Sequence, residues 1–338
     1  MSWRGLGRRV TPKNVRPNAR FDILVLNFQR VGLFLDNFAK LQGFDPARDR
    51  IVIMDCSDNA DEERERTRRF AARHGWELGG PTITFISRPN WGIDQGARID
   101  YLDQYLADAA PFVWQFQEHY LDNTSDYARW GSSAGPLAGT VKEDVLPDDA
   151  VLDLDSSERA FSDPAVSAVF ASRSGIGLFA HSDGSEWFYA DGANFGFRTS
   201  VAREAFSHEL LDDYRLVFDG SYRWCQFIEF EFSRQLSRGA WFDLSRQKRF
   251  DDHAAVKAAE REAGRPLSSS ASRKDARVVA RYSQRMKLVR RLPGDVRRAL
   301  LRTSFPFFGK FQSHVFLPLR AKLMKRGIDS PAWFRELW

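Results

Sequence analysis

Polar and titratable side chains stand directly behind four short apolar runs of this 338-residue chain. In chain order they are Asn27, Asp55, Asn90, Gln117, Glu118 and His119. Carboxylates and imidazoles both coordinate metals, so Glu118 and His119 are candidate metal ligands. If one fold brings the ends of the four runs together, these side chains would form a single ligand-binding site.

The segments around these residues predict the elements that would position them. Short, mostly apolar runs predict buried strands at 22–27, 50–55, 82–86 and 112–116. Helical spacing and charge predict helices at 31–41, 61–74 and 92–110. This alternation is typical of right-handed βαβ units with a mainly parallel sheet. Ligands bind at the carboxyl ends of such strands, where the polar residues stand.

The second half of the chain shows a looser pattern. Residues 123–147 are rich in Gly, Ser, Thr and Ala and predict a long loop. Further helices are expected at 151–161 and 221–238, and further strands within 188–197 and at 240–244. The composition of residues 264–272 predicts a linker.

The composition excludes several classes of protein. Hydrophobic residues make up 43% and charged residues 28%, as in a globular protein rather than a disordered one. Cys56 and Cys225 are the two cysteines, which excludes a disulfide framework and a cysteine-cluster zinc site. No run approaches the roughly 18 apolar residues of a membrane span, and the basic N-terminus has no apolar stretch behind it. We therefore expect a cytoplasmic protein.

The net charge of +5 hides a strong asymmetry. Residues 1–20 hold six basic residues and no acid, and residues 273–326 hold sixteen basic residues and two acids. Residues 21–272 therefore carry a large negative charge. A basic tail of this kind meets a membrane surface, a nucleic acid or the acidic body itself.

The order of four motifs resembles that of a bacterial GT-A glycosyltransferase of the family 2 type, over residues 21–255. The motifs are LNFQR at 26–30, IMDCSDN at 53–59, RPNWGIDQGAR at 88–98 and FIEFEFSRQL at 227–236. The resemblance implies an α/β fold of the GT-A (Rossmann-like) type: a mixed, mainly parallel sheet flanked by helices, here with a basic helical C-terminal extension. It also implies a nucleotide-sugar donor and a cell-envelope glycan, polysaccharide or lipid-linked acceptor.

The resemblance also implies roles for individual residues. Asp55 matches the family's nucleoside-binding Asp, and Glu229 matches the carboxylate that acts as the acceptor's base, with Glu231 as the second choice. His253 matches a late His that can serve as the third metal ligand. The expected donor-binding residues are Asn27, Arg30, Asp55, Asn90, Gly92, Arg98, Gln117 and Asn194.

The expected metal motif departs from the family pattern. Where the family carries Asp-x-Asp, this chain reads QFQEHYLD at 115–122, so that Gln117 replaces the first Asp. Either Glu118 and His119 hold a Mn²⁺ or Mg²⁺ ion, or Glu143 and Asp144 do so beyond an insertion.

The chemistry explains why such residues would be needed. Negative charge builds on the β-phosphate as the glycosidic bond breaks, and a divalent metal stabilises that charge. The acceptor hydroxyl must lose its proton as it attacks, and a carboxylate such as Glu229 near the start of a helix can accept it. Direct displacement with a single base inverts the anomeric centre.

The sequence thus predicts a basic N-terminal arm (1–20), a catalytic domain (21–263), a linker (264–272) and a basic helical region (273–338). The basic region either packs its apolar stripe on the body or meets an anionic membrane surface, which would make the enzyme peripheral on the inner face of the cell membrane. Nucleic acid is the least favoured partner because no nucleic-acid-binding motif accompanies the charge. The rivals to the enzyme are a catalytically silent binding or scaffold protein and a nucleic-acid binder.

Overall fold

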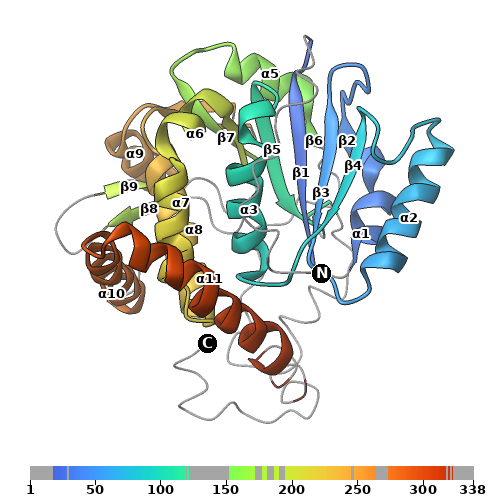
Figure 1. The fold of residues 1–338 in the computed structure, drawn as a ribbon. Helices are drawn as coiled ribbons and strands as arrows, with labels where there is room; N and C mark the ends of the chain where they lie inside the picture. The colour runs from blue at the N-terminus through green and yellow to red at the C-terminus, as the bar shows by residue number, and fades with distance from the viewer. Residues whose placement is uncertain are drawn as a thin grey trace.

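The computed structural model describes residues 18–28, 30–118, 120–121, 152–171, 177–180, 186–189, 195–244, 247–263, 273–316, 319 and 322. Its centre is an eight-stranded mixed sheet in the order β12-β11-β7-β10-β5-β1-β3-β4 (Figure 1). Four neighbouring strands run parallel to one another: β5 (Phe112–Gln117), β1 (Phe21–Asn27), β3 (Arg50–Asp55) and β4 (Ile83–Ser87). These are the four strands that the apolar runs predict.

The other half of the sheet mixes directions. Its strands are β7 (Val166–Phe170), β10 (Phe195–Arg198), β11 (Ala240–Asp243) and β12 (Lys248–Phe250). β10 is antiparallel to both of its neighbours, β11 is parallel to β7, and β12 is antiparallel to β11. Six of the eight strands therefore point the same way, which confirms the predicted α/β fold with a mixed, mainly parallel sheet.

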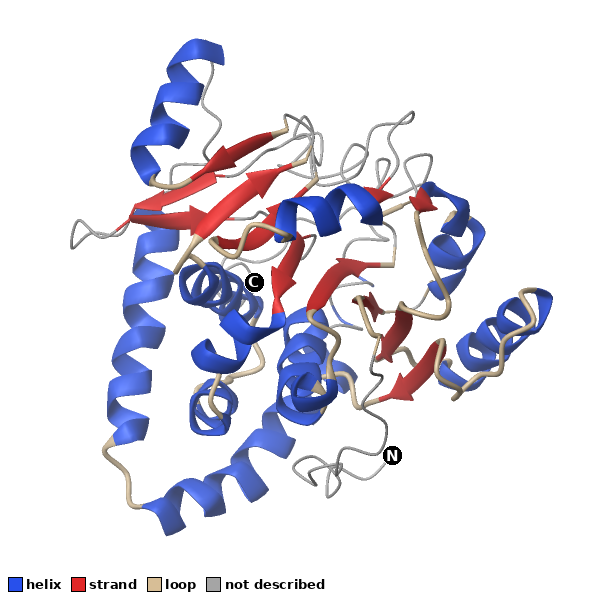
Figure 2. Cartoon of the chain, turned by 90° about the horizontal axis from the view of Figure 1, so that it is seen from above, coloured by secondary structure: helices blue, strands red, loops and turns tan. Residues whose placement is uncertain are grey.

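Helices cover both faces of this sheet, as the view from above shows (Figure 2). Those of the first half are α1 (Val31–Asp36), α2 (Ala60–Arg73) and α3 (Ile93–Gln104), with short 3-10 helices η2 (Phe38–Lys40) and η3 (Leu106–Asp108). Those of the second half are α5 (Leu154–Phe161), α6 (Thr199–Ala205), α7 (His208–Leu216), α8 (Tyr222–Leu236) and α9 (His253–Ala263).

The remaining strands are short and lie outside the main sheet. β2 (Leu41–Gln42) pairs with β6 (Leu152–Asp153), and β8 (Gly177–Ala180) pairs with β9 (Glu186–Tyr189). The helix predicted from residue 151 thus begins at Leu154, because Asp153 caps it by accepting a hydrogen bond from the Asp155 amide.

Side chains alternate between two cores along the central strands, as the two-residue period of a strand requires. Leu24 and Leu26 of β1 pack on the side that also holds residues of α3, α6, α7 and α8. Ile23 and Val25 face the opposite side, where α1, α2 and α5 contribute. β1 and β3 are buried on both faces, which explains their nearly continuous apolar sequence.

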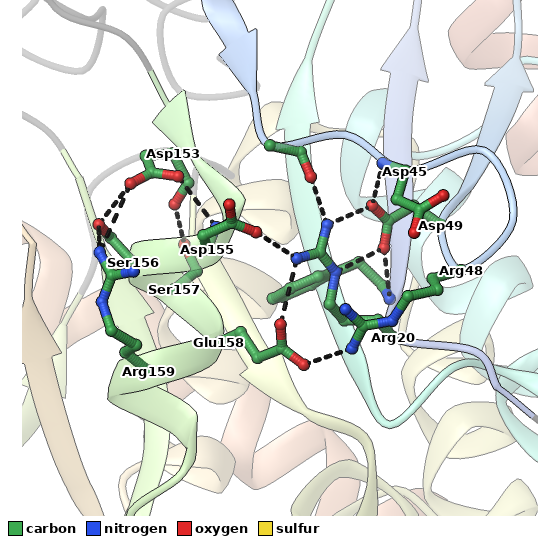
Figure 3. Close-up of polar contacts among 12 residues, drawn as sticks. Arg20, Asp45, Arg48, Asp49, Asp153, Asp155, Ser156, Ser157, Glu158 and Arg159 are labelled. Atoms are coloured by element: carbon green, nitrogen blue, oxygen red, sulfur yellow. Dashed lines mark hydrogen bonds and ion pairs between the residues drawn. The ribbon is translucent and has the colours of Figure 1, made fainter.

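An ionic network ties the start of β1 to its neighbours (Figure 3). The buried guanidinium of Arg20 pairs with Asp49 at 2.6 Å, with Asp155 at 2.5 Å and with Glu158 at 3.1 Å. Arg48 reaches the second oxygen of Glu158 at 2.6 Å. This network lies at the amino end of β1, so it stabilises the edge opposite the candidate site.

The basic C-terminal region contributes α10 (Arg273–Arg290), α11 (Gly294–Phe311) and a π-helical turn η4 (Gln312–Phe316). The apolar stripe of α10 is buried in the core that α7 and α8 help to form, which is the packing alternative of the sequence analysis. Arg285 pairs with Asp219 at 2.5 Å and Arg290 with Asp213 at 2.8 Å. Among the described residues, no helix is both long enough and apolar enough to span a membrane.

Candidate active site

The carboxyl ends of the four parallel strands bring the predicted polar residues to one edge. Asn27 of β1 is level with Asp55 of β3, and Asp55 is level with Ser87 of β4. On the other side of β1, Leu26 is level with Gln117 of β5. Strand register therefore places Asn27, Asp55 and Gln117 on adjacent strands at the edge where such sheets bind ligands.

A buried polar cluster forms where β1 and β3 end. The Asn27 amide donates to Asp55 Oδ1 at 2.6 Å and to Glu63 Oε2, on α2, at 3.3 Å. Glu63 also accepts the backbone N–H of Val31, at the start of α1, at 2.6 Å. The second oxygen of Asp55, Oδ2, is buried and accepts no hydrogen bond from the described residues. It is therefore an acceptor for which the described fold supplies no donor.

Burial sets the titration of this cluster. It raises the pKa of Asp55 above its usual value. Hydrogen bonds from Ser57 and Asn27 and the positive charge of Arg64 lower that pKa, but burial has the larger effect. Burial likewise raises the pKa of Glu63, although Val31 and Asn27 donate to it. Two carboxyl groups with raised pKa values on neighbouring elements are typical of functional sites.

Glu118 lies one strand further, at the end of β5. It is buried, and this burial raises the pKa of its carboxyl group to about 7. The positive charge of Arg30 lowers that pKa and the negative charge of Asp94 raises it. Asp94 also accepts the side-chain amide of Gln117 at 2.9 Å. Arg30, Asp94, Gln117 and Glu118 thus occupy one neighbourhood.

The buried thiol of Cys56 is close enough to feel the charges of both Asp55 and Glu118. Burial raises the pKa of Cys56 to about 12, Arg88 lowers it, and the carboxylates of Asp55, Glu118 and Asp94 raise it further. A side chain that follows Asp55 in sequence is therefore within electrostatic reach of both strand ends.

The loop after β4 is held by the core rather than opened toward a ligand. Arg88 pairs with Asp100 at 2.7 Å and donates to the Trp91 carbonyl at 3.0 Å. The Gly92 amide donates a hydrogen bond to Gln312 Oε1 at 2.6 Å. This N–H is therefore not available to bind a nucleotide-sugar donor. Asn90 is half-buried, and its side-chain oxygen accepts no hydrogen bond from the described residues.

Arg98 lies in the core. It has no exposed surface, and its guanidinium carbon is 4.7 Å from the ring centroid of Phe232 and 5.7 Å from that of Phe195. A donor would reach this side chain only after a rearrangement. Arg98 therefore packs between Phe195 of β10 and Phe232 of α8. Its expected contact with the nucleotide-sugar donor stays a prediction.

α8 carries both candidate bases. Glu229 is half-buried near the middle of the helix, not near its start as expected, because the helix begins at Tyr222 with Ser221 as its cap. Glu231 is buried and forms a two-pronged ion pair with Arg234, at 2.9 and 2.7 Å, on the same helix. This pairing engages both oxygens of the Glu231 carboxylate, and the base roles expected of Glu229 and Glu231 stay predictions.

The pKa of a second buried thiol, Cys225, responds to the charges of both Glu229 and Asp94. Burial raises the pKa of Cys225 well above its usual value, and the carboxylates of Asp94, Asp219 and Glu229 raise it further. Cys225 also lies 3.5 Å from the carbonyl oxygen of Gly92. Asp94 is therefore an electrostatic neighbour of both thiols.

Several expected metal ligands cannot be placed. His119, Glu143 and Asp144 lie outside the described residues, as does the donor residue Asn194. His253 begins α9 just after β12, which runs against β11 and so leads the chain away from the edge where Glu118 lies. The side chain of His253 lies outside the described part of the chain, and its role as a metal ligand stays a prediction. No group of three potential metal-binding side chains occurs in the part of the chain that the structure describes.

Sequence reasoning did not single out Glu63 or Asp94. Asp94 stands in the first turn of α3 and inside the RPNWGIDQGAR motif at 88–98, so its position was a usable signal. Glu63 lies in the charged helix α2 and shows no such signal. Its role depends on a tertiary contact with Asn27, 36 residues earlier.

No family model and no curated protein matches the sequence. Among solved structures, S. aureus TarS 1-349 in complex with UDP is similar over 90% of this chain and 78% of its own, with 12% identity and a TM-score of 0.35. Mannosyltransferase PcManGT from Pyrobaculum calidifontis, in complex with GDP-Man and Mn²⁺, is similar over 96% of this chain and 92% of its own, with 11% identity and a TM-score of 0.33. At such TM-scores the similarity carries no argument about the site.

Proposed function

We propose that this chain is a glycosyltransferase that moves a sugar from a nucleotide-sugar donor to a cell-envelope glycan or lipid-linked acceptor. The observation that carries the proposal is the 2.6 Å hydrogen bond between Asn27 and Asp55, at the carboxyl ends of adjacent parallel strands. The buried amide holds the Asp55 carboxylate in one orientation and leaves Oδ2 without a donor among the described residues. The motif resemblance supplies the reaction class.

Asp55 would bind the nucleoside. An ionised carboxylate accepts hydrogen bonds and donates none, so it selects a ligand that presents N–H or O–H groups, as ribose and the nucleobases do. Asn27 would hold the Asp55 carboxylate in position through its hydrogen bond, and Glu63 would in turn hold the Asn27 amide. Arg30, half-buried beside Glu118, would add positive charge near the diphosphate.

A divalent cation fits this neighbourhood in part. Mg²⁺ is usually held by one or two carboxylates together with substrate phosphates, and Glu118 and Asp94 are two neighbouring carboxylates. The pKa of about 7 at Glu118 reflects a burial cost that a bound cation would offset. When bound, such an ion would stabilise the charge that develops on the leaving diphosphate.

Glu229 would accept the proton of the acceptor hydroxyl. It is half-buried, and its helix packs against α3, whose first turn contains Asp94. A carboxylate on the acceptor side supports direct displacement, so we propose inversion at the anomeric carbon. Glu231 is engaged by Arg234 and is not expected to replace it.

The test of donor binding is a melting-point panel of UDP, GDP, dTDP and CMP, each with and without Mn²⁺. A ligand that binds only the folded state raises the melting temperature. Asp55→Asn should weaken binding by roughly ten- to a hundredfold, because a hydrogen bond to a charged group contributes about 1.5–3 kcal/mol. Asp61→Asn, at an exposed site on α2, is the matched control and should bind as the wild type does.

The test of catalysis compares two variants of one helix. Glu229→Gln should abolish sugar transfer and donor hydrolysis while nucleotide still raises the melting temperature. Glu231→Gln should retain transfer if the protein remains folded. Nucleotide binding without turnover in the wild type would favour the catalytically silent rival, and no binding of any nucleotide would overturn the proposal.

A further inference from the structure

Two buried glutamine side chains near the candidate site have polar atoms that the described residues leave unpaired. Gln115 of β5 has no exposed surface, and neither its side-chain oxygen nor its side-chain nitrogen has a hydrogen-bond partner among the described residues. Gln95 of α3 is 2% exposed; its side-chain nitrogen donates to Asp94 at 3.2 Å, but its oxygen accepts no hydrogen bond from the described residues. Because a buried amide without partners destabilises a fold, such a group usually has a ligand or an ordered water as its partner.

Strand register places Gln115 on the face of the sheet that α3 covers. Gln115 is level with Leu24 of β1 and with Phe195 of β10, and side chains at level positions of adjacent strands point to the same side. Leu24 and Phe195 both belong to the core that contains residues of α3 and α8. Gln117, two residues further along β5, points to this side as well, and it donates to Asp94 in the first turn of α3 at 2.9 Å. This face therefore carries polar side chains from the strand end inward.

Asp55, the expected nucleoside-binding residue, lies on the opposite face. Ile51 and Ile53 of β3 pack in the core that α1, α2 and α5 line, and the two-residue period of a strand puts Asp55 on their side. The helix α8, which carries Glu229, covers the face of Gln115. A donor whose nucleoside contacts Asp55 would therefore cross the strand ends to reach the face of the expected base. The part of the donor that reacts with the acceptor is the sugar.

We propose that Gln95 and Gln115 bind hydroxyl groups of the donor sugar. This inference rests on the proposed glycosyltransferase function, and it names the side chains that would hold the sugar within that site. A hydroxyl group both donates and accepts, so it can donate to the side-chain oxygens of Gln95 and Gln115 and accept from the side-chain nitrogen of Gln115. No other class of group on the donor satisfies all of these atoms.

The diphosphate of the donor matches these atoms less well. An ionised phosphate carries acceptor oxygens, so it would leave the oxygens of Gln95 and Gln115 without a donor. It would also meet the negative charge of Asp94, which the side-chain amides of Gln95 and Gln117 hold in place. An ordered water would satisfy the same atoms as a hydroxyl group, and it is the alternative that the experiment must exclude.

The experiment measures dissociation constants of the full chain by calorimetry, without an acceptor. The probes are UDP, GDP and dTDP, each alone and with glucose or mannose attached. Gln115→Met replaces the amide by an apolar side chain of similar length, so this variant should melt no lower than the wild type. It should weaken binding of the nucleotide sugar by roughly two- to tenfold, as expected for the loss of a neutral hydrogen bond, and leave binding of the free nucleotide unchanged. Gln95→Met is the second variant and should show the same difference.

The matched control is Gln235→Met on α8. Gln235 is also buried, but its side-chain oxygen accepts a hydrogen bond from Arg238 at 2.8 Å. This control should bind the nucleotide and the nucleotide sugar in the same ratio as the wild type does.

Two results would overturn the inference and leave the proposed function standing. One is a Gln115→Met variant that binds nucleotide and nucleotide sugar with equal changes or with none. The other is a Gln115→Met variant that melts well below the wild type, which would show that an ordered water already pairs with the amide. If the wild type binds none of the probes, the proposed function itself fails, and this inference fails with it.

Discussion

The side-chain oxygen of Gln312 accepts a 2.6 Å hydrogen bond from the backbone N–H of Gly92, 220 residues earlier in the chain. Gln312 is fully buried, and Gly92 caps the amino end of α3. The basic C-terminal region is therefore part of the structure that shapes the loop after β4. Phe305 strengthens the same junction by packing edge-on against Trp91, with ring centroids 4.6 Å apart.

Removing the Gln312 side chain should destabilise this junction. Gln312→Ala leaves the Gly92 N–H buried without its partner, which costs about 1–3 kcal/mol of unfolding free energy. Urea denaturation measures the loss. Gln284→Ala, at an exposed position on α10, removes the same side chain from the surface and should change stability much less. Equal losses in the two variants would show that the Gln312 contact contributes nothing specific.

Gly92 should be less tolerant of substitution than another glycine of similar backbone conformation. Its φ is +62°, and an added Cβ would lie 2.6 Å from the Trp224 ring. Gly75 has a φ of +72° and nothing within 4 Å of the same Cβ position. Both alanine variants bear the backbone cost of roughly 1–2 kcal/mol, but only Gly92→Ala adds about 1–3 kcal/mol of steric overlap. Paired urea titrations should resolve this difference, and similar midpoints would contradict the tight contact with Trp224.

The raised pKa of Glu118 predicts how its contribution to stability depends on pH. The folded-state pKa is about 7 against an ordinary value of 4.5, so the folded protein holds this proton more tightly than the unfolded chain. Stability attributable to Glu118 should therefore fall as the pH rises from about 4.5 to 7, by about 3 kcal/mol in all. Glu118→Gln should be more stable than the wild type at pH 8 and similar near pH 5.

The measurement is urea denaturation of both proteins at the two pH values. Glu62→Gln, exposed on α2, serves as the control and should show the same difference from the wild type at both. If Glu118→Gln gains no stability at pH 8 relative to pH 5, then the burial cost assigned to Glu118 is wrong.

The ion-pair network beneath the loop after β4 should matter for folding. Arg215 is 5% exposed and contacts Asp100 at 3.1 Å and Asp103 at 2.9 Å. Arg215→Met removes a positive charge that balances the buried carboxylates of Asp100 and Asp103. Losing one partner of such a pair lowers the unfolding free energy by about 3–5 kcal/mol. Arg68→Met breaks an exposed pair with Glu65 on α2 and should cost less than about 1 kcal/mol. Thermal melts compare the two, and equal shifts would refute the buried network's role.

The sequence determined the parts of this protein that depend on local pattern. Runs that are buried on both faces, such as β1 and β3, cannot alternate in polarity, so their apolar composition marks them directly. Asn27, Asp55 and Gln117 terminate such runs, and parallel strands bring their carboxyl ends to one edge. The α/β class and the edge that holds the candidate site were therefore predictable.

Only the tertiary structure decided which of these residues meet and in what state. The hydrogen bond from Asn27 to Glu63 and the contact between Gly92 and Gln312 join distant segments, and no local period encodes such pairs. The antiparallel pairing of β12 with β11 likewise joins segments through long-range packing, and it sets where α9 begins. Strand direction and burial arise from long-range packing, and they determine whether a carboxylate is paired, as Glu231 is, or has its pKa raised by desolvation, as Glu118 has.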